Sequence, residues 1–458
     1  MSNPKEITIV GAGLVGSLLS VLLGQRGYKV NVYEKRGDMR RKDVDSGRSI
    51  NLALAERGIH ALKKAGLMDE VQPLLIPMKG RVLHDRAGEL DFLAYGQRPE
   101  EVIYSVSRGE LNKILMESAD QHENVTLHFN HELQSIDFKN QKIEMVDNAD
   151  GQSNDLSYEI LIGADGAGSR VRRALLPVVD GTDNSELLDH DYKELTIPAG
   201  PGGQHQIERE ALHIWPRGGF MLIALPNVDG SFTVTLFLQK QGKPSFESLQ
   251  DKSALDEFFQ TEFPDALKLI PDLATEYYEN PQGVLGTVRC EPWNYEDSVL
   301  LIGDASHAIV PFHGQGMNAG FEDAALVIDE LEKFGGKWDA MIPCFGALRK
   351  LDADAIADMA LENYITMRDS VRDPNFALKK ELGFSLEKEL PNLFIPRYSQ
   401  VMFHRVPYAQ AQSRGIVQQG ILKMLVDGKE NILEIDMSEA CALARKGLIA
   451  FDESCLAN

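Results

Sequence analysis

The chain has 458 residues, which is too long for one simple hydrophobic core, so two or three domains are expected. With 43% hydrophobic and 25% charged residues, its composition is that of an ordinary soluble globular protein. Its formal net charge of −22 argues against nucleic acid and anionic membranes as partners, although a local pocket can still be basic enough for an anionic cofactor.

The four cysteines do not form any Cys-x-x-Cys pair, so neither a zinc site nor a disulfide scaffold is indicated. Reduced thiols in a cytoplasmic protein are the default expectation. The apolar stretch from Ile7 to Leu23 is interrupted by three glycines and runs into a second strand, which a cleavable signal peptide would not need. No other stretch reaches the roughly 18 apolar residues of a membrane span.

The first elements in the chain are a strand at residues 6–10, a Gly-x-Gly-x-x-Gly motif, a helix to about residue 27 and a strand at residues 30–33. In such a motif the first glycine makes the turn, the second admits a pyrophosphate and the third lets the helix pack on the strand. An acidic residue at the end of the second strand would accept hydrogen bonds from a ribose. The pattern therefore predicts a dinucleotide-binding unit that uses Gly11, Gly13, Gly16 and Glu34.

A helix is expected at residues 57–64, and several strands are expected between residues 78 and 106. These strands interrupt the α/β pattern, so they either cover the cofactor or belong to a second sheet. Ser107 and Arg108 then begin an amphipathic helix. Arg108 is equally compatible with a surface charge and with a ligand contact.

A strand at residues 125–129 precedes a β-meander between about residues 133 and 158. The next strand ends in Gly163-Ala-Asp-Gly166, and a helix follows. Asp165 between glycines is typical of a second cofactor-binding turn, although a plain glycine-rich turn is the alternative. Residues from about 185 to 290 are rich in alternating strands, which predicts a mostly antiparallel substrate domain.

The stretch from Val299 to Ala325 contains a short buried strand, Gly303-Asp304, three further glycines and a helix from about Met317. Gly314, Gly316 and Gly320 would let the backbone approach something closely. Free N–H groups at the start of a helix suit an anion, and Asp304 suits a ribityl or ribose hydroxyl. The alternative is a tight strand–helix connection without a ligand.

Helical spacing of apolar residues is found from residue 352 to 368 and in much of the chain from residue 385 onwards. Asn363 and Met367 are four residues apart, so they share one helical face. The expected fold class is α/β, with a Rossmann-like dinucleotide-binding domain, which the resemblance described next identifies as an FAD-binding domain, a mostly antiparallel β substrate domain and a C-terminal helical region. These three parts are expected at residues 1–75, 107–180 and 291–335, at residues 76–106 and 181–290, and at residues 336–458, respectively.

The three glycine motifs, in this order, resemble the single-component flavoprotein aromatic hydroxylases of the p-hydroxybenzoate hydroxylase fold. The likeness is closer still to the kynurenine 3-monooxygenases and covers residues 5 to about 410. It extends through longer strings, namely Gly47-Arg-Ser-Ile-Asn-Leu-Ala-Leu54, Ser105-Val-Ser-Arg-x-x-Leu-Asn112, Glu194-Leu-Thr-Ile-Pro198, Leu212-His-Ile-Trp-Pro216 and Ile309-Val-Pro-Phe-x-Gly-Gln-Gly-Met-Asn318.

The resemblance implies FAD as the bound cofactor and NADPH as a co-substrate. The FAD-binding residues that it implies, together with those of the glycine motifs, are Gly11, Gly13, Val15, Gly16, Tyr33, Glu34, Lys35, Arg36, Ala53, Arg108, Leu133, Asp165, Asp304, Gly316, Met317 and Asn318. Only one Gly-x-Gly-x-x-Gly motif is present, so NADPH is expected to bind transiently across the FAD domain.

The resemblance also implies that Arg81 and Tyr95 hold the carboxylate of L-kynurenine, assisted by Asn363 and Tyr398. An arginine offers a two-pronged donor for a carboxylate, and a tyrosine adds a directed O–H group. From the residues alone, Arg81 would be taken as a surface charge. The other expected substrate contacts, or pocket walls, are Phe237, Met221, Ile223, Pro311, Phe312, His313 and Met367.

The chain departs from animal members of the family in two places. His313 stands where they have a second phenylalanine, and it either tunes the pocket or fills it. The C-terminal tail is too short and too polar to span a bilayer, so no membrane anchor is expected. A homodimer is one assembly that the sequence allows.

The implied reaction needs FAD, NADPH and O₂, and it proceeds through a C4a-hydroperoxyflavin that transfers one oxygen atom to the kynurenine ring, giving 3-hydroxykynurenine. No catalytic side chain and no metal is required. A dry pocket is required, because water would let the hydroperoxide decay to H₂O₂. The alternatives are a hydroxylase of another aromatic carboxylic acid, such as a benzoate, and a flavin- or NAD-binding protein without oxygenase activity.

Overall fold

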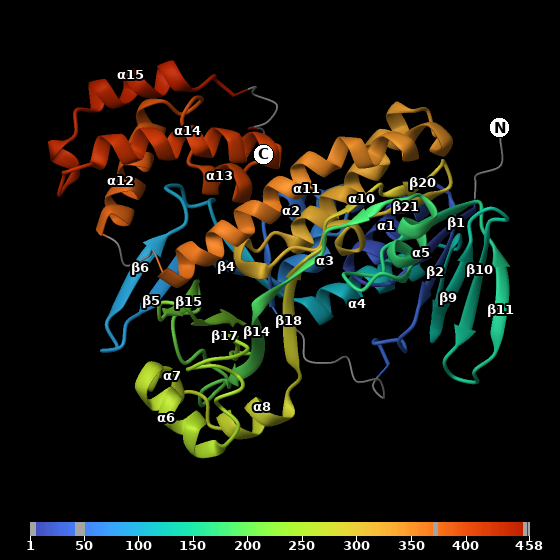
Figure 1. The fold of residues 1–458 in the computed structure, drawn as a ribbon, viewed down its shortest axis with the longest axis horizontal. Helices are drawn as coiled ribbons and strands as arrows, with labels where there is room; N and C mark the ends of the chain where they lie inside the picture. Colours follow the sequence, from blue (N-terminus) through green and yellow to red (C-terminus); the bar gives the residue numbers. More distant parts are fainter. Residues whose placement is uncertain (1–5, 42–50, 370–373, 452–455, 457–458) are drawn as a thin grey trace. The chain divides into compact units, whose positions relative to one another are not determined.

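A computed structural model describes residues 6–41, 51–369, 374–451 and 456 (Figure 1). The chain divides into two compact units, and each is described here by itself. The first comprises Met1–Leu75, Val106–Leu187 and Gly286–Ala357, and the second comprises Ile76–Ser105, Leu188–Leu285 and Asp358–Asn458. Residues 47–50, which begin one of the family strings, lie outside the described residues.

The first unit is built on a six-stranded sheet with the order β20-β21-β12-β1-β2-β8. All neighbouring pairs are parallel except β20 and β21. The central strands are short apolar runs that are almost fully buried, as expected for a parallel sheet covered on both faces. The bounds are β20 Asn294–Tyr295, β21 Val299–Leu301, β12 Ile160–Gly163, β1 Glu6–Val10, β2 Lys29–Glu34 and β8 Val125–Phe129.

Helices alternate with these strands, which is the α/β pattern expected from the sequence. The predicted apolar face of α10 is buried at Phe321, Ala324 and Ile328. Ser107 caps α4 by accepting a hydrogen bond from the Glu110 N–H group. The helices are α1 Leu14–Gly24, α2 Glu56–Ala65, α3 Met68–Val71, α4 Arg108–Asp120, α5 Arg170–Val178, α9 Asp304–His307, α10 Gly316–Lys333 and the first part of α11 Trp338–Asp369.

The predicted β-meander is present as a separate antiparallel sheet of β9 His131–Asp137, β10 Lys142–Asp147 and β11 Ser153–Ser157. Two short strands, β13 Thr182–Asp183 and β19 Cys290–Glu291, also pair in this unit. The helical spacing noted at residues 352–368 belongs to a longer helix, α11, which begins at Trp338. Trp338 is buried against Tyr28, a contact from another part of the chain that apolar periodicity does not reveal.

The second unit is built on a seven-stranded sheet with the order β18-β14-β17-β16-β15-β5-β6. It is mostly antiparallel, as predicted, but β5 and β15 are parallel. Of the strands expected between residues 78 and 106, β5 and β6 belong to this second sheet, whereas β7 belongs to a separate small sheet. The bounds are β18 Gln282–Thr287, β14 Glu186–Ile197, β17 Phe232–Gln239, β16 Met221–Pro226, β15 Ala211–Pro216, β5 Gly80–His84 and β6 Leu90–Ala94, while β4 Ile76–Met78 pairs with β7 Ile103–Ser107.

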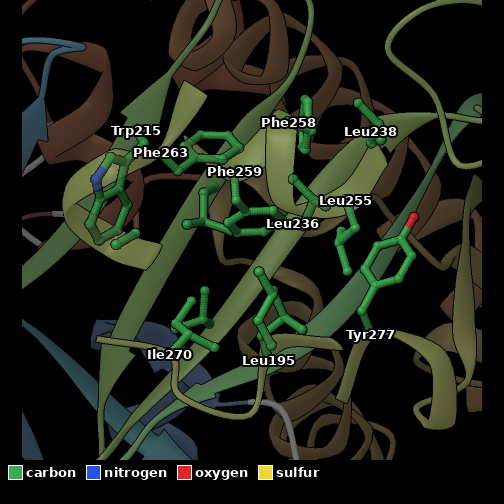
Figure 2. Packing of buried hydrophobic residues seen from close by; sticks show 14 of the residues in the cluster. Leu195, Trp215, Leu236, Leu238, Leu255, Phe258, Phe259, Phe263, Ile270 and Tyr277 are labelled. Carbon is green, nitrogen blue, oxygen red and sulfur yellow. The ribbon is translucent and has the colours of Figure 1, made fainter. Parts of the chain in front are cut away.

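One face of the seven-stranded sheet carries the hydrophobic core of the second unit. Leu195, Trp215 and Leu236 on that face pack with Phe259 and other aromatic side chains from the helical segment after β17 (Figure 2). Because side chains alternate along a strand, the opposite face must carry the intervening residues. The helices of this segment are α6 Lys252–Glu262, α7 Pro264–Leu267 and α8 Leu273–Glu279.

The C-terminal part of the second unit is helical, as predicted from residue 385 onwards. A separate apolar cluster forms between its helices, with Leu382, Phe394 and Ala440 fully buried. The helices are α12 Pro374–Glu389, α13 Arg397–Met402, α14 Tyr408–Val426 and α15 Met437–Gly447. Across the described residues, no helix combines the length and the apolar character needed to cross a bilayer.

Candidate functional site

The Gly-x-Gly-x-x-Gly motif forms the turn between β1 and α1. Gly11 has φ of +104°, and its N–H group donates to the Tyr33 carbonyl at 2.8 Å. A Cβ atom at Gly16 would lie 2.0 Å from the Gly11 carbonyl oxygen, so this glycine is required by the packing of α1 on the turn. A Cβ atom at Gly13 would meet nothing within 4 Å. Gly13 therefore borders open space at the position where a pyrophosphate is expected to approach.

Glu34 ends β2 beside this turn and is buried, with 5% of its surface exposed. Its Oε2 atom accepts the Ala12 N–H group at 3.0 Å, and its Oε1 atom accepts the N–H and the Nε of Arg36 at 3.0 and 2.8 Å. Burial raises the pKa of Glu34, but the hydrogen bonds and charge of Arg36 outweigh burial and lower it overall. Glu34 is thus an ionised acceptor at the end of the second strand, where a ribose hydroxyl would need one.

The other residues predicted around the adenosine end are spread over several elements of the first unit. Tyr33 is buried, and its ring stacks on His128 with a centroid distance of 4.5 Å. Lys35 and Arg36 are exposed just beyond β2. Leu133 is buried on β9, and its carbonyl accepts a hydrogen bond from Arg170 at 2.8 Å.

Asp165 has a structural role that the motif alone did not reveal. Its carboxylate accepts the Ser169 hydroxyl at 2.5 Å and the Arg170 N–H group at 2.6 Å, at the start of α5. A carboxylate at this position satisfies backbone donors that have no partner within the helix. Asp165 therefore fixes the start of α5, whether or not it also contacts a ligand.

The Gly303-Asp304 turn is packed directly against α1. Gly303 has φ of +58°, and a Cβ atom there would lie 3.2 Å from Val15. A Cβ atom at Gly320 would lie 2.6 Å from the same side chain, so the packing of Val15 requires a glycine at this position. Asp304 is exposed at the start of α9 and is attracted by the Arg108 guanidinium. The two predicted cofactor contacts Asp304 and Arg108 are therefore close enough to interact.

A buried ionic network, which the sequence analysis missed, supports this turn. Asp323 on α10 is fully buried and accepts the Gly303 N–H group at 2.9 Å and the Arg349 Nε at 2.9 Å. The Nε2 atom of His307 lies 2.5 Å from the same carboxylate. Burial alone would raise the pKa of Asp323, but attraction to His307 and Arg349 outweighs it and lowers the pKa to about 2. The only signal in the sequence is an acidic pair, Glu322-Asp323, beside an apolar helix face.

The start of α10 is joined to β3 (Asn51–Leu54) by one side chain. Asn318 donates its amide to the carbonyls of Ala53 and Gly314, each at 2.8 Å, and accepts the Ala55 N–H group at 2.9 Å. The Asn318 side chain thus serves the protein backbone. Met317 is largely buried, whereas a Cβ atom at Gly316 would have no neighbour closer than 3.8 Å.

These features fit FAD. The first unit contains four features that suit such a cofactor. They are an open glycine at the first turn, an ionised acceptor at the end of β2, an exposed aspartate beside an arginine, and the N-terminus of an 18-residue helix. Backbone N–H groups at a helix start favour anions, and carboxylates accept from sugar hydroxyls. The donors and acceptors match a ligand that has both phosphates and hydroxyls.

The second unit contains a cation beside a stacked pair of aromatic rings. The rings of Tyr95 and Tyr398 stack with centroids 5.4 Å apart, and the Arg81 guanidinium carbon lies 5.4 and 5.3 Å from them. Arg81 Nε and the Tyr95 hydroxyl are buried and, among the described residues, have no hydrogen-bond partner of ordinary geometry. Buried donors of this kind favour a polar ligand atom beside them. An anion such as a carboxylate would satisfy them.

Strand register places the predicted pocket walls on the same face as Arg81. Arg81 pairs with Leu212 on β15, and Ile214, two residues on, pairs with Ile223 on β16. Met221 is two residues from Ile223 and pairs with Phe237 on β17. Since paired and alternate residues share a face, Arg81, Ile223, Met221 and Phe237 all lie opposite the hydrophobic core.

The remaining predicted substrate residues belong to different units. In the second unit, the Asn363 amide donates to the Met367 sulfur at 3.4 Å, which confirms that the two share a helix face. Phe312 and His313 belong to the first unit, where both are buried in a short 3₁₀ turn before α10. Among the predicted substrate residues, the structure thus shows direct contact of Arg81 with Tyr95 and Tyr398, and of Asn363 with Met367.

Comparison with known proteins agrees with both the fold and the cofactor. The model of the FAD binding domain family matches residues 5–335. Among solved structures, PqsL of Pseudomonas aeruginosa, a probable FAD-dependent monooxygenase, has a TM-score of 0.63 at 21% identity over 80% of this chain and 97% of its own. The 2-methyl-3-hydroxypyridine-5-carboxylic acid oxygenase has a TM-score of 0.66 at 18% identity over 81% of this chain and 95% of its own. At such identities these two structures show the fold, and they confirm the α/β class.

Closer relatives are found by sequence. A kynurenine 3-monooxygenase of Myxococcus xanthus is 47% identical over 98% of this chain and 97% of its own length. Another, of Stenotrophomonas maltophilia, is 45% identical over 94% of each. This chain therefore belongs to the FAD binding domain family and, within it, to the kynurenine 3-monooxygenases.

Proposed function

We propose that the protein is an FAD-dependent monooxygenase that hydroxylates L-kynurenine to 3-hydroxykynurenine, with NADPH and O₂ as co-substrates. Membership of the kynurenine 3-monooxygenase family supports the reaction. The single observation that carries the substrate class is the Arg81 guanidinium, with its unpartnered Nε atom, beside the stacked rings of Tyr95 and Tyr398. This arrangement suits the carboxylate of an aromatic amino acid.

FAD, when bound, supplies the electron-transfer and oxygen chemistry, and the side chains bind, orient and exclude water. On the FAD side, Gly13 gives the pyrophosphate room, and Glu34 and Asp304 accept from sugar and ribityl hydroxyls. The buried Asp323 holds the backbone N–H group of Gly303 in place and so fixes Asp304 next to it. These assignments are supported by the open space at Gly13 and by the ionised state of Glu34.

On the substrate side, Arg81 would hold the carboxylate, and the hydroxyls of Tyr95 and Tyr398 would add directed hydrogen bonds. Burial raises the pKa of both tyrosines, so both remain neutral O–H donors near pH 7. The apolar side chains Met221, Ile223 and Phe237 would form a dry wall for the aromatic ring. Asn363, Met367, Phe312 and His313 remain predicted contacts of the substrate.

Four further expectations remain predictions. They are the transient binding of NADPH on the FAD-binding unit, a cytoplasmic location, a homodimeric assembly and the assignment of residues 336–458 to a region separate from the other two domains. The expectation for NADPH is supported only by the likeness of these sequence strings to those of related enzymes.

The proposal is tested by incubating the purified yellow protein with L-kynurenine, NADPH and air and analysing the product by mass spectrometry. A product one oxygen atom heavier than kynurenine, with the hydroxyl at the ring carbon ortho to the amino group, is expected. A panel of benzoates run in parallel separates the alternative substrate class. Hydroxylation of a benzoate but not of kynurenine, or NADPH oxidation that is unaffected by every acid, would overturn the proposal.

A further inference from the structure

A second cation lies beside the arginine–tyrosine cluster. The ammonium group of Lys380 on α12 donates a hydrogen bond to the carbonyl of Ala94, which immediately precedes Tyr95. It also lies 5.5 Å from the centre of the Phe384 ring. Lys380 is partly buried and interacts electrostatically with Arg81. No family string that was identified in the sequence includes this lysine.

The surroundings of Lys380 disfavour its charge. Burial has the largest effect, repulsion from Arg81 adds to it, and attraction to Asp91 on β6 offsets only part, so that the pKa of Lys380 falls to about 8. Tyr95 and Tyr398 are neutral. On the neighbouring helices, Arg414 of α14 is bound to the carbonyls of Leu393 and Ile449, while Lys423 of α14 and Glu439, Arg445 and Lys446 of α15 are exposed.

The charges around the cluster are therefore unbalanced. Among the groups that act on Lys380, Arg81 and Lys380 itself contribute +2 and Asp91 contributes −1, which leaves +1. Arg98, Glu101 and Glu387, on the loop after β6 and on α12, pair with one another instead. A partly buried excess cation is unfavourable unless an anion neutralises it. Register places Asp91 on the same sheet face as Arg81, because Leu93 pairs with Arg81 and Asp91 is two residues from Leu93. One carboxylate added at this face would restore neutrality.

We propose that Lys380 is a second substrate-binding cation, which acts with Arg81 on the carboxylate of the substrate and takes up a proton as the substrate binds. This inference rests on the proposed function only for the identity of the substrate, since any aromatic carboxylate would have the same effect. Linkage requires that a ligand which favours the charged lysine raises the proton affinity of that lysine. Binding should therefore weaken as the pH rises through about 8, where the free protein loses the charge.

A purely structural role is the alternative, because the hydrogen bond to Ala94 also fastens α12 to the end of β6. Other polar contacts also attach α12 to the segment that follows β6. Gln97 donates to the carbonyl of Phe384 at 3.1 Å and to Glu387 at 2.7 Å, and Arg98 lies 3.2 Å from Glu387. Gln97→Ala therefore weakens the same attachment without changing any charge, and it provides a matched control.

The test is calorimetric titration of the FAD-loaded enzyme with L-kynurenine, and separately with benzoate, between pH 7 and 9 in buffers of different ionisation enthalpy. Wild type should take up part of a proton near pH 8. Lys380→Gln should bind about tenfold or more weakly at pH 7, with no proton uptake. Lys380→Arg should retain the affinity at pH 7 and lose the pH dependence near 8, because arginine remains charged.

Equal loss of affinity in Lys380→Gln and Gln97→Ala, with proton uptake unchanged in both, would show a structural role and overturn the proposal. Unchanged affinity and proton uptake in Lys380→Gln would overturn it as well. If wild type binds benzoate with proton uptake but does not bind kynurenine, the proposed substrate is wrong while the role of Lys380 stands.

Discussion

Replacing Asp323 by asparagine tests whether the buried ionic network holds the Gly303-Asp304 turn. The substitution keeps the size of the side chain but removes the charge opposite Arg349, whose side chain is only 3% exposed. Removing one member of a buried ion pair typically destabilises a protein by about 3–5 kcal/mol, because the remaining charge stays buried without compensation. Arg349 keeps Glu322 at 3.0 Å and Asp352 at 3.5 Å, so we expect a loss near the lower end of this range, about 3 kcal/mol in the free energy of unfolding, together with weaker retention of FAD.

A matched control lies on the same helix. Glu332 pairs with Arg26 at 2.8 Å, but the glutamate side chain is 58% exposed. Exposed pairs contribute at most about 1 kcal/mol, so Glu332→Gln should be nearly neutral. Both variants and wild type would be unfolded in urea as the FAD-loaded protein, with circular dichroism and flavin fluorescence as probes.

The pH dependence gives a second measurement on the same variants. The folded pKa of Asp323 is lowered to about 2, so the stability that it contributes is present above its unfolded value of about 3.9 and is lost as the pH falls through the folded value. Asp323→Asn should lose this component of the acid dependence, whereas Glu332→Gln should keep it. If the two variants are equally stable and have the same acid dependence, the reasoning about the network is wrong.

Three other predictions concern the candidate ligand contacts. Arg81→Ala should raise the KM for kynurenine about 10- to 100-fold with FAD still bound, which follows from losing a charged hydrogen bond, and an unchanged KM in a folded yellow variant would contradict the carboxylate assignment. Gly13→Ala should fold but bind FAD more weakly in a fluorescence titration, whereas Gly16→Ala should misfold because its Cβ has no room. Equal FAD affinity of Gly13→Ala and wild type would refute the position of the pyrophosphate. Tyr398→Phe should consume NADPH with more H₂O₂ and less hydroxylated product, and full coupling of this variant would count against a role for the hydroxyl.

The sequence predicted the elements of the sheets because local patterns determine them. The apolar residues of β16 and β17 and the Asn227-Val-Asp-Gly230 turn between them were sufficient to identify a hairpin. The structure pairs the two strands antiparallel, from Met221 opposite Phe237 to Pro226 opposite Phe232. The Gly-x-Gly-x-x-Gly turn after β1 was also predicted from a local pattern. The start of α11 at Trp338 was not predicted, and Trp338 contacts Tyr28, which is distant in the sequence.

Residues that act through distant partners could not be found in the same way. Asp323 is separated from Gly303 by 20 positions and from Arg349 by 26, and nothing in its neighbourhood distinguishes it from the adjacent Glu322. Lys380 is equally inconspicuous, since Lys379 precedes it in the same helix. Gly320 was identified as a point of close approach, but its neighbour could not be named from the sequence, because only the fold brings Val15 to it.

The two faces of the seven-stranded sheet separate two kinds of evolutionary constraint within a single strand. In β16, Leu222 and Ala224 belong to the apolar cluster on one face, whereas Met221 and Ile223 belong to the other. Substitutions at the first pair should be selected mainly for folding, and those at the second pair for the shape of the ligand. A lineage could therefore change the aromatic acid it recognises through alternate positions of β16 and β17 while the packing beneath is preserved, but a single-residue deletion would exchange the two sets and abolish both at once.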